Sequence, residues 1–187
     1  MPPPLRLLPG AFTVEKYYKL GELGVFREDD RVELVNGQIV PMSPIGDAHA
    51  SCVRRLNTVL SRRLGESAIV DAQNPVILGE YDSPQPDITV LKSRADGYRK
   101  HPRSRDILLV IEVADSSLAY DRDVKIPRYA QAGISEVWIV DVNAETISIY
   151  RDPESEVYRK VQTVKRGEII RPVKLAPLEI EVDEILG

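Results

Sequence analysis

Hydrophobic residues fill both faces of two strand-length segments in the middle of the chain, residues 107–114 and 136–142. Such segments are typical of strands inside a sheet that is covered on both sides. Residues 116–133 lie between them, carry helix signals and end at Gly133, a common helix stop. A strand, a helix and a second strand at this spacing predict two parallel strands. The expected core residues are Leu109, Val110, Ile111, Val113, Val137, Ile139 and Val140.

Pro127 sets the expected start of the helix within residues 116–133. Because proline is tolerated in the first helical turn or at a kink, we expect the regular helix to begin close to Asp123. Lys125 then lies near the start of the helix. A helix that follows a strand starts beside the carboxyl end of that strand, so Lys125 is expected close to the end of residues 107–114.

The first half of the chain predicts helices and a hairpin. Residues 1–10 are rich in proline and are expected to be extended. Thr13 is expected to cap an amphipathic helix over residues 14–23, with its partly apolar side toward the protein. The residues expected on that side are Phe12, Tyr17 and Leu20. Asn36-Gly37 separates two short apolar segments and strongly predicts a β-hairpin.

Further helix and strand signals complete a mixed pattern. Residues 47–64 predict a helix that ends at Gly65, and residues 68–78 predict one strand bent at Pro75. Residues 87–91 predict a strand whose pairing starts after Pro86. The segments expected to follow are antiparallel strands over 146–151 and 157–164, then a last strand and a short helix within 178–186. The sequence therefore predicts an α/β fold, with a mixed central sheet flanked by helices.

Length and composition place the chain among globular proteins. At 187 residues, of which 43% are hydrophobic, we expect one domain over residues 1–187. No apolar segment approaches the twenty or so residues of a membrane helix, and the start of the chain lacks a signal-peptide pattern. We therefore expect a cytoplasmic protein without a membrane partner. Cys52 is the single cysteine, which excludes an internal disulfide and a cysteine-based zinc cluster.

The net charge of −4 means that any binding of nucleic acid must depend on a local basic patch. Residues 92–105 carry six Lys or Arg and one Asp. This segment joins two predicted strands and is expected beside the carboxylates that they carry. The residues predicted to contact DNA phosphates are Arg99, Lys100, Arg103 and Arg105. The alternative is an ordinary solvated loop.

Two carboxylates stand out on the predicted central strands. Glu112 interrupts an apolar strand, where an ionised side chain needs a cation or several donors, and Asp87 opens the strand after Pro86. Carboxylates on neighbouring strands can share a hard divalent cation such as Mg²⁺, which takes one or two protein carboxylates and accepts phosphate oxygens. Lys125 is placed to reach that cation or its water.

The motifs that carry this chemistry are Pro86-Asp87, Glu112-Val113-Ala114 and the run Asp121-x-x-x-Lys125-x-x-x-Tyr129-x-x-x-Gly133. Together they resemble the putative restriction endonucleases of the PD-(D/E)XK nuclease superfamily. The resemblance implies a restriction-endonuclease-like core preceded by a helix and a β-hairpin. It also implies that Asp87, Glu112 and the Val113 carbonyl hold the metal. Ala114 stands where the superfamily usually has lysine, so that lysine is expected to be displaced onto the helix as Lys125.

Three further residues match the family upstream and are second-rank candidates. Glu33 is most simply interpreted as a solvent-facing residue of the hairpin. The resemblance instead suggests that it is an acidic residue near the metal. For His49, a partly buried structural histidine is at least as good an interpretation as a catalytic one. Gln73 precedes the predicted bend, where a polar side chain ordinarily satisfies backbone groups.

The favoured function is a Mg²⁺-dependent endonuclease, with Mn²⁺ as the second choice of metal. In it, Asp87 and Glu112 hold the cation and Lys125 orients the attacking water or helps to deprotonate it. One alternative is a DNA-binding or assembly module that keeps the fold with little or no activity, which Ala114 and the acidic charge favour. A hydrolase of small phosphate esters is weaker, because no glycine-rich phosphate loop is present. By analogy with nucleases that cut both strands, we expect a homodimer or higher homo-oligomer.

Overall fold

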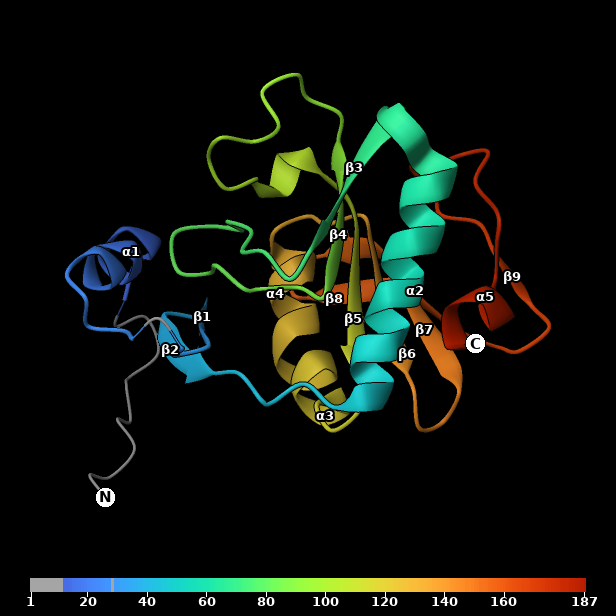
Figure 1. Cartoon of the computed structure of the whole chain (residues 1–187), viewed down its shortest axis with the longest axis horizontal. Helices are drawn as coiled ribbons and strands as arrows, with labels where there is room; N and C mark the ends of the chain where they lie inside the picture. Colours follow the sequence, from blue (N-terminus) through green and yellow to red (C-terminus); the bar gives the residue numbers. More distant parts are fainter. Residues whose placement is uncertain (1–11, 28) are drawn as a thin grey trace.

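The computed structural model describes residues 12–27 and 29–187 (Figure 1). The proline-rich segment predicted to be extended lies outside these residues. The elements are α1 Val14–Glu22, β1 Val32–Val35, β2 Gln38–Pro41, α2 Asp47–Leu64, η1 Gly65–Ser67, β3 Ala68–Ala72, β4 Ile88–Lys92, η2 Ser104–Asp106, β5 Ile107–Ala114, α3 Leu118–Tyr120, η3 Asp121–Lys125, α4 Ile126–Gln131, β6 Glu136–Asp141, β7 Thr146–Glu154, β8 Val157–Lys165, β9 Ile169–Ile170, β10 Ile180–Glu181 and α5 Val182–Leu186.

A six-stranded mixed sheet forms the centre of the fold, in the order β3-β4-β5-β6-β7-β8. β5 and β6 are parallel, and the other neighbours are antiparallel. The parallel pair is the one predicted from the strand, helix, strand pattern, since the chain between the two strands forms α3, η3 and α4. The α/β fold with helices flanking a mixed sheet is therefore confirmed.

Helices cover both faces of this sheet (Figure 1). α2 packs its Leu56 and Leu60 in a cluster with Ile111 and Val113 of β5, and α5 joins this cluster. α4 packs Tyr129 in a second cluster that includes Val110, Val137 and Ile139. All seven predicted core residues are buried, because β5 and β6 have a helical layer against each face. The alternation along β5 turns Glu112 toward the α4 side.

The N-terminal elements agree largely with the sequence. The Thr13 hydroxyl accepts the Lys16 N–H at 3.2 Å and caps α1, while the apolar side of α1 is only half-buried. Asn36 and Gly37 have φ of 50° and 69°, the left-handed pair that a tight hairpin between β1 and β2 requires.

The predicted strand over residues 68–78 is wrong in its second half. β3 ends at Ala72, because Gln73 takes a positive φ of 54° and turns the chain out of the sheet before Pro75 is reached. The segment from Gln73 to Pro86 then forms a long loop. It returns to the sheet where Gln73 N–H donates to the Asp87 carbonyl at 3.1 Å.

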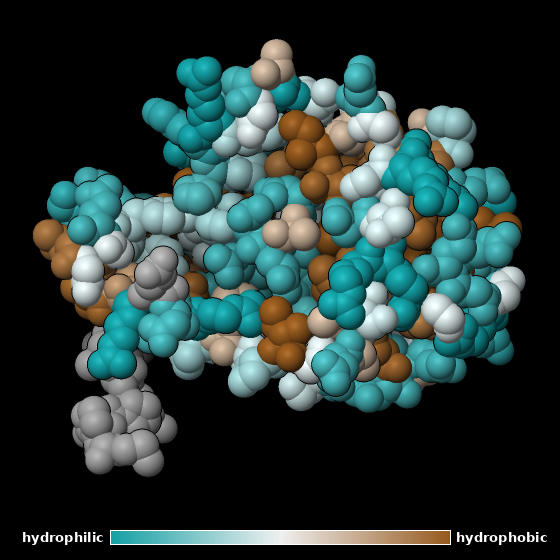
Figure 2. All heavy atoms as spheres, viewed as in Figure 1, coloured by the Kyte–Doolittle hydropathy of each residue, from teal (hydrophilic) through white to brown (hydrophobic). Residues whose placement is uncertain are grey.

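On the face shown in Figure 2, hydrophilic residues cover most of the surface and hydrophobic residues form separate small groups. Among the residues that the structure describes, no helix combines the length and apolar character needed to span a membrane.

Candidate active site

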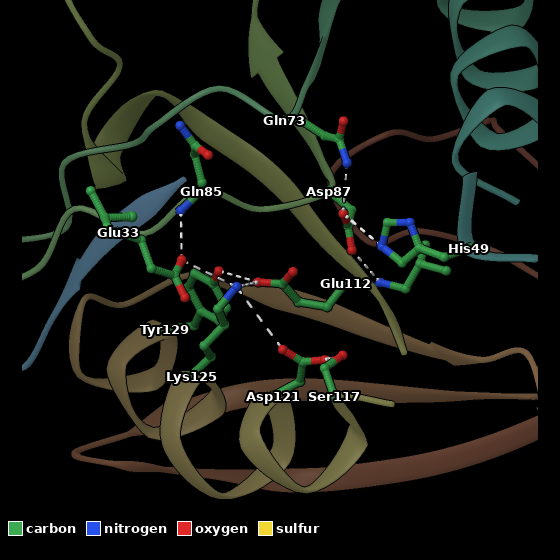
Figure 3. Close-up of polar contacts among 12 residues, drawn as sticks. Glu33, His49, Gln73, Gln85, Asp87, Glu112, Ser117, Asp121, Lys125 and Tyr129 are labelled. Atoms are coloured by element: carbon green, nitrogen blue, oxygen red, sulfur yellow. Dashed lines mark hydrogen bonds and ion pairs between the residues drawn. The ribbon is translucent and has the colours of Figure 1, made fainter. Parts of the chain in front are cut away.

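Asp87 and Glu112 lie at the same end of two neighbouring strands (Figure 3). Asp87 directly precedes β4, and Glu112 is close to the carboxyl end of the antiparallel β5. The Asp87 carboxylate is held by three donors. Its Oδ2 accepts the Val113 N–H at 2.8 Å, and its Oδ1 lies 3.0 Å from His49 Nε2 and 3.3 Å from Gln73 Nε2. The two carboxylates thus meet near the end of the sheet, as the sequence predicted.

The Val113 carbonyl lies where the ladder between β4 and β5 runs out. Ile88 pairs with Ile111, so continuing this register sets Val113 opposite Pro86. Proline has no N–H, so the ladder offers no donor to the Val113 carbonyl at this position. The N–H and C=O of one strand residue point to the same side, and the Val113 N–H points to Asp87. The carbonyl is therefore directed toward the same side.

Lys125 lies among three carboxylates and is itself buried, with 5% of its surface exposed. Its Nζ is 3.2 Å from Glu112 Oε1, 3.3 Å from Glu33 Oε2 and 4.0 Å from Asp121 Oδ1 (Figure 3). Burial alone would lower the pKa of the ammonium, but the neighbouring carboxylates, Glu112 first, raise it above its ordinary value. The helix thus places a positive charge beside Glu112, whereas Ala114 on the strand is uncharged.

The helix that carries Lys125 starts earlier than predicted. It begins at Leu118, passes through the π-helical turn η3 and continues as α4, so Lys125 is near its middle rather than in its first turn. Pro127 is tolerated because it follows the π-helical turn, where the Ile126 N–H donates to the Asp121 carbonyl and the regular ladder is already interrupted.

The described contacts of the Glu112 carboxylate all engage Oε1, which accepts from Lys125 and from the Tyr129 hydroxyl. Among the residues that the structure describes, Oε2 has no hydrogen-bond partner, and Glu112 lines the cleft. Burial raises the pKa of Glu112 from 4.5 to about 8, against the opposing effect of Lys125, and the charges of Asp121 and Asp87 raise it further. A raised pKa is what two neighbouring carboxylates predict, but burial is the larger cause here.

Glu33 is not the solvent-facing residue that the hairpin pattern favoured. It is 3% exposed, because β1 turns this side chain inward against the sheet end. Its Oε2 accepts the Gln85 N–H at 3.0 Å and pairs with Lys125. Glu33 thereby connects the N-terminal hairpin to the segment that leads into Asp87.

His49 and Gln73 both reach the site through Asp87. His49 lies in the first turn of α2, and the contact of its Nε2 with Asp87 is the main cause that raises the pKa of its imidazole. Its Nδ1 is buried without a hydrogen-bond partner among the described residues. The Gln73 side chain donates to the Asp87 carboxylate and not to a backbone group, while the Gln73 main-chain N–H donates to the Asp87 carbonyl.

The basic segment is not beside the carboxylates, contrary to the expectation. Because β4 and β5 are antiparallel, the loop that joins Lys92 to Ile107 leaves from their other ends. Ile107 is five residues from Glu112 along β5, or about 17 Å of extended strand. Phosphate binding by Arg99, Lys100, Arg103 and Arg105 stays a prediction, but closeness to Asp87 and Glu112 does not support it.

The site residues line a cleft of about 290 Å³. Five carboxylates line it, and two basic residues, Lys125 and Arg31, line it together with His49. The carboxylates are those of Glu33, Asp87, Glu112, Asp115 and Asp121. In residues 12–27 and 29–187, no three His, Cys, Asp or Glu side chains are arranged to hold a metal by themselves. Two carboxylates, a carbonyl and an excess of negative charge nevertheless fit Mg²⁺, which keeps several waters and needs few protein ligands. The residues present therefore fit a hard divalent cation.

Comparison with known proteins gives a family for this chain and a similar solved structure. A model of the Uma2 family, described as putative restriction endonucleases, matches residues 14–184. The chain belongs to the Uma2 family. A crystal structure described as a putative nuclease belonging to DUF820 from Anabaena variabilis is similar, with a TM-score of 0.74 over 94% of this chain and 97% of that one. At 16% identity it shows a shared fold. A search of curated proteins finds no match.

Three residues near Lys125 in this Uma2 site, Ser117, Asp121 and Tyr129, have no individual role predicted from the sequence. Asp121 accepts the Ser117 hydroxyl at 2.6 Å and faces Lys125, and Tyr129 donates to Glu112. Asp121, Lys125 and Tyr129 are spaced by four residues, which sets them on one side of a helix. That spacing is a signal in the sequence that could have identified both neighbours of Lys125.

Proposed function

We propose that this Uma2 protein is a metal-dependent endonuclease that hydrolyses phosphodiester bonds in DNA. The family description and the similar nuclease structure support a nuclease in general terms. The observation that carries the finer proposal is the buried Lys125 ammonium 3.2 Å from Glu112, at the end of the sheet where Asp87 also lies. Lys125 thus supplies a cation in a chain that has Ala114 where the superfamily pattern has lysine.

In this proposal Asp87, Glu112 and the Val113 carbonyl hold Mg²⁺, with Mn²⁺ as the alternative ion. The cation supplies Lewis-acid chemistry, polarising a phosphate oxygen and making water a better nucleophile. The chain's own part is to keep its ligands in place. Val113 N–H, His49 and Gln73 fix the Asp87 carboxylate, while Lys125 and Tyr129 occupy one oxygen of Glu112 and leave the other for the metal.

Lys125 serves in this mechanism as a donor rather than as a base. An ammonium held by Glu112 and Glu33 at 3.2 and 3.3 Å remains protonated, so it orients water or phosphate by hydrogen bonding. Of the two roles predicted for it, orientation of the water is therefore the one we propose.

The experiment that tests this function compares supercoiled, linear and single-stranded DNA with the purified protein. We expect cleavage in millimolar Mg²⁺ or Mn²⁺ and none in EDTA, because the carboxylates alone cannot neutralise the transition state. Gel electrophoresis measures the products, and Asp87→Asn should be inactive with either metal. Binding of DNA without any cleavage would favour the alternative, a DNA-binding or assembly module that retains the fold.

The homo-oligomer expected from the sequence also stays a prediction. Analytical ultracentrifugation of the active protein should give a species heavier than the 21.0 kDa chain. A monomer at concentrations that cleave DNA would contradict it.

A further inference from the structure

A second hollow, of about 470 Å³, lies apart from the catalytic cleft and shares no lining residue with it. Its wall combines aromatic rings with cations. The side chains involved are Tyr18, Tyr98, His101, Arg99, Lys100 and Arg103. They come from α1 and from the basic segment between β4 and β5, which lies at the end of these strands away from the metal ligands.

The aromatic part of this hollow is a fixed stack. The rings of Tyr18 and His101 lie 5.0 Å apart between centroids with an angle of 19° between their planes. The Tyr18 hydroxyl is hydrogen-bonded to Ser83 Oγ at 2.9 Å, so its ring is held in place. His101 is the exposed member, and partial burial lowers the pKa of its imidazole. At neutral pH a flat uncharged ring therefore faces the hollow.

The basic segment is tied to the rest of the fold and is not a freely solvated loop. Ile77 N–H donates to the Pro102 carbonyl at 2.8 Å, and Ser104 N–H donates to the Ile77 carbonyl at 3.1 Å. At the other side of the loop, the Tyr98 hydroxyl donates to the Lys92 carbonyl at 2.9 Å. In Figure 2, hydrophilic side chains project from the part of the surface where Figure 1 has this loop.

The three cations of this loop that line the hollow are not neutralised within the part of the chain that the structure describes. No ion pair involves Arg99, Lys100 or Arg103 there. The two acids of the loop are occupied, since Asp96 pairs with Arg94 at 2.8 Å and Asp106 accepts the Arg103 backbone N–H at 2.9 Å. A protein with a net charge of −4 thus keeps a group of free cations around an aromatic stack.

We propose that this hollow binds single-stranded nucleic acid, with a base on the outer face of His101 and neighbouring phosphates on Arg99, Lys100 and Arg103. Aromatic rings next to cations are the arrangement that binds unpaired strands, because every base has a face that can stack. In a duplex those faces are covered by neighbouring pairs, so the ring would contribute nothing. The inference goes beyond the cleavage proposed above, since it gives the protein a second contact with the strand.

The test is equilibrium binding by the full chain in EDTA, which keeps it independent of cleavage. Fluorescence anisotropy of a labelled twelve-nucleotide thymidine strand and of a duplex of equal length gives the two affinities. We expect His101→Ala to weaken single-strand binding by roughly 5- to 150-fold, the range for one stacked base. His101→Phe should restore most of the affinity, because it keeps a ring. Neither variant should change the melting temperature much.

The cations are tested separately by salt dependence. Arg99→Ala with Lys100→Ala should lower the slope of log affinity against log salt by roughly 0.7 for each phosphate that the variant no longer binds. The matched control is Arg54→Ala with Arg62→Ala, which removes the same charge from the exposed side of α2 and should leave the slope unchanged.

Three results would each overturn the proposal. The first is single-strand binding by His101→Ala with the affinity of the parent, and the second is a decrease of the salt slope in the Arg54→Ala, Arg62→Ala control equal to that in Arg99→Ala, Lys100→Ala. The third is a loss of affinity in His101→Ala that is equal for duplex and single strand. Failure here leaves metal-dependent cleavage untouched, and failure of cleavage leaves this binding measurable.

Discussion

Replacing Lys125 with methionine is expected to reduce DNA cleavage by about 100-fold or more and to lower the free energy of unfolding by about 3–5 kcal/mol. The loss of rate follows from the loss of the one lysine donor in the cleft. The loss of stability follows because Glu112, Glu33 and Asp121 are left buried without their shared cation. A lysine in the first helical turn, as the sequence suggested, would have been removable at no cost to folding.

The same variant should respond more strongly to metal than the parent protein does. With Lys125 gone, the cleft is more negative, so Mg²⁺ should raise the melting temperature of Lys125→Met by more than it raises that of the parent. Thermal unfolding with and without Mg²⁺ measures this directly. Cleavage is measured well below the melting temperature of the variant.

Arg151→Met is the matched control for this substitution. Arg151 pairs at 2.8 Å with Glu136, which is 1% exposed and does not line the cleft. Its replacement should cost stability by the same mechanism but leave cleavage and the effect of Mg²⁺ unchanged. Normal cleavage by Lys125→Met would rule out the role proposed for the lysine, and equal loss of cleavage in both variants would attribute it to instability.

The sequence predicted the sheet well because its signals are local. The apolar strands, the Asn36-Gly37 turn and the helix that ends at Gly65 each depend on residues a few positions apart, and each forms as predicted. The antiparallel pairing of β4 with β5 brings Asp87 and Glu112 together, and the order of the two motifs already suggested that neighbourhood.

The errors concern side chains whose surroundings come from distant segments. Glu33 looks solvent-facing within its hairpin, but its partners Gln85 and Lys125 come from segments far along the chain. Pro127 predicts a start of the lysine helix near Asp123, whereas a π-helical turn accommodates this proline inside a helix that begins earlier. The basic segment lies away from the carboxylates because β4 and β5 run antiparallel, which the local pattern does not reveal. Strand direction decides at which end a connecting loop lies.

Glu112→Gln is expected to abolish cleavage and to remove most of the stabilisation by Mg²⁺. If the parent binds the cation in the folded state alone, it gains about 2.7 kcal/mol at a cation concentration one hundred times Kd. Glutamine keeps the shape and one oxygen but not the charge that a hard cation needs. Melting curves of the parent and of Glu112→Gln across a Mg²⁺ titration provide the measurement.

The pH dependence gives this substitution a second readout. The pKa of Glu112 rises from 4.5 to about 8 on folding. Between these two pH values, the carboxyl group of Glu112 is protonated in the folded metal-free protein and ionised in the unfolded chain. Its contribution therefore makes the metal-free protein less stable as the pH rises through this window. Glu112→Gln should lack that decline. In the parent, Mg²⁺ should stabilise more at pH 9 than at pH 6, because the proton must leave before the metal binds.

Glu136→Gln distinguishes a buried carboxylate of the site from one that only supports the fold. Glu136 accepts hydrogen bonds from Arg151 at 2.8 Å, Trp138 Nε1 at 2.8 Å and Val173 N–H at 2.7 Å. Both of its carboxylate oxygens therefore have donors within the fold. Its neutral isostere should destabilise the metal-free protein by several kcal/mol, since it breaks a buried ion pair, yet leave the increment from Mg²⁺ intact. Glu112→Gln should show the opposite pattern at pH 7. It should lose little stability in EDTA, and Mg²⁺ should not stabilise it further. An undiminished Mg²⁺ increment in Glu112→Gln would remove this residue from the metal site, whatever its effect on cleavage.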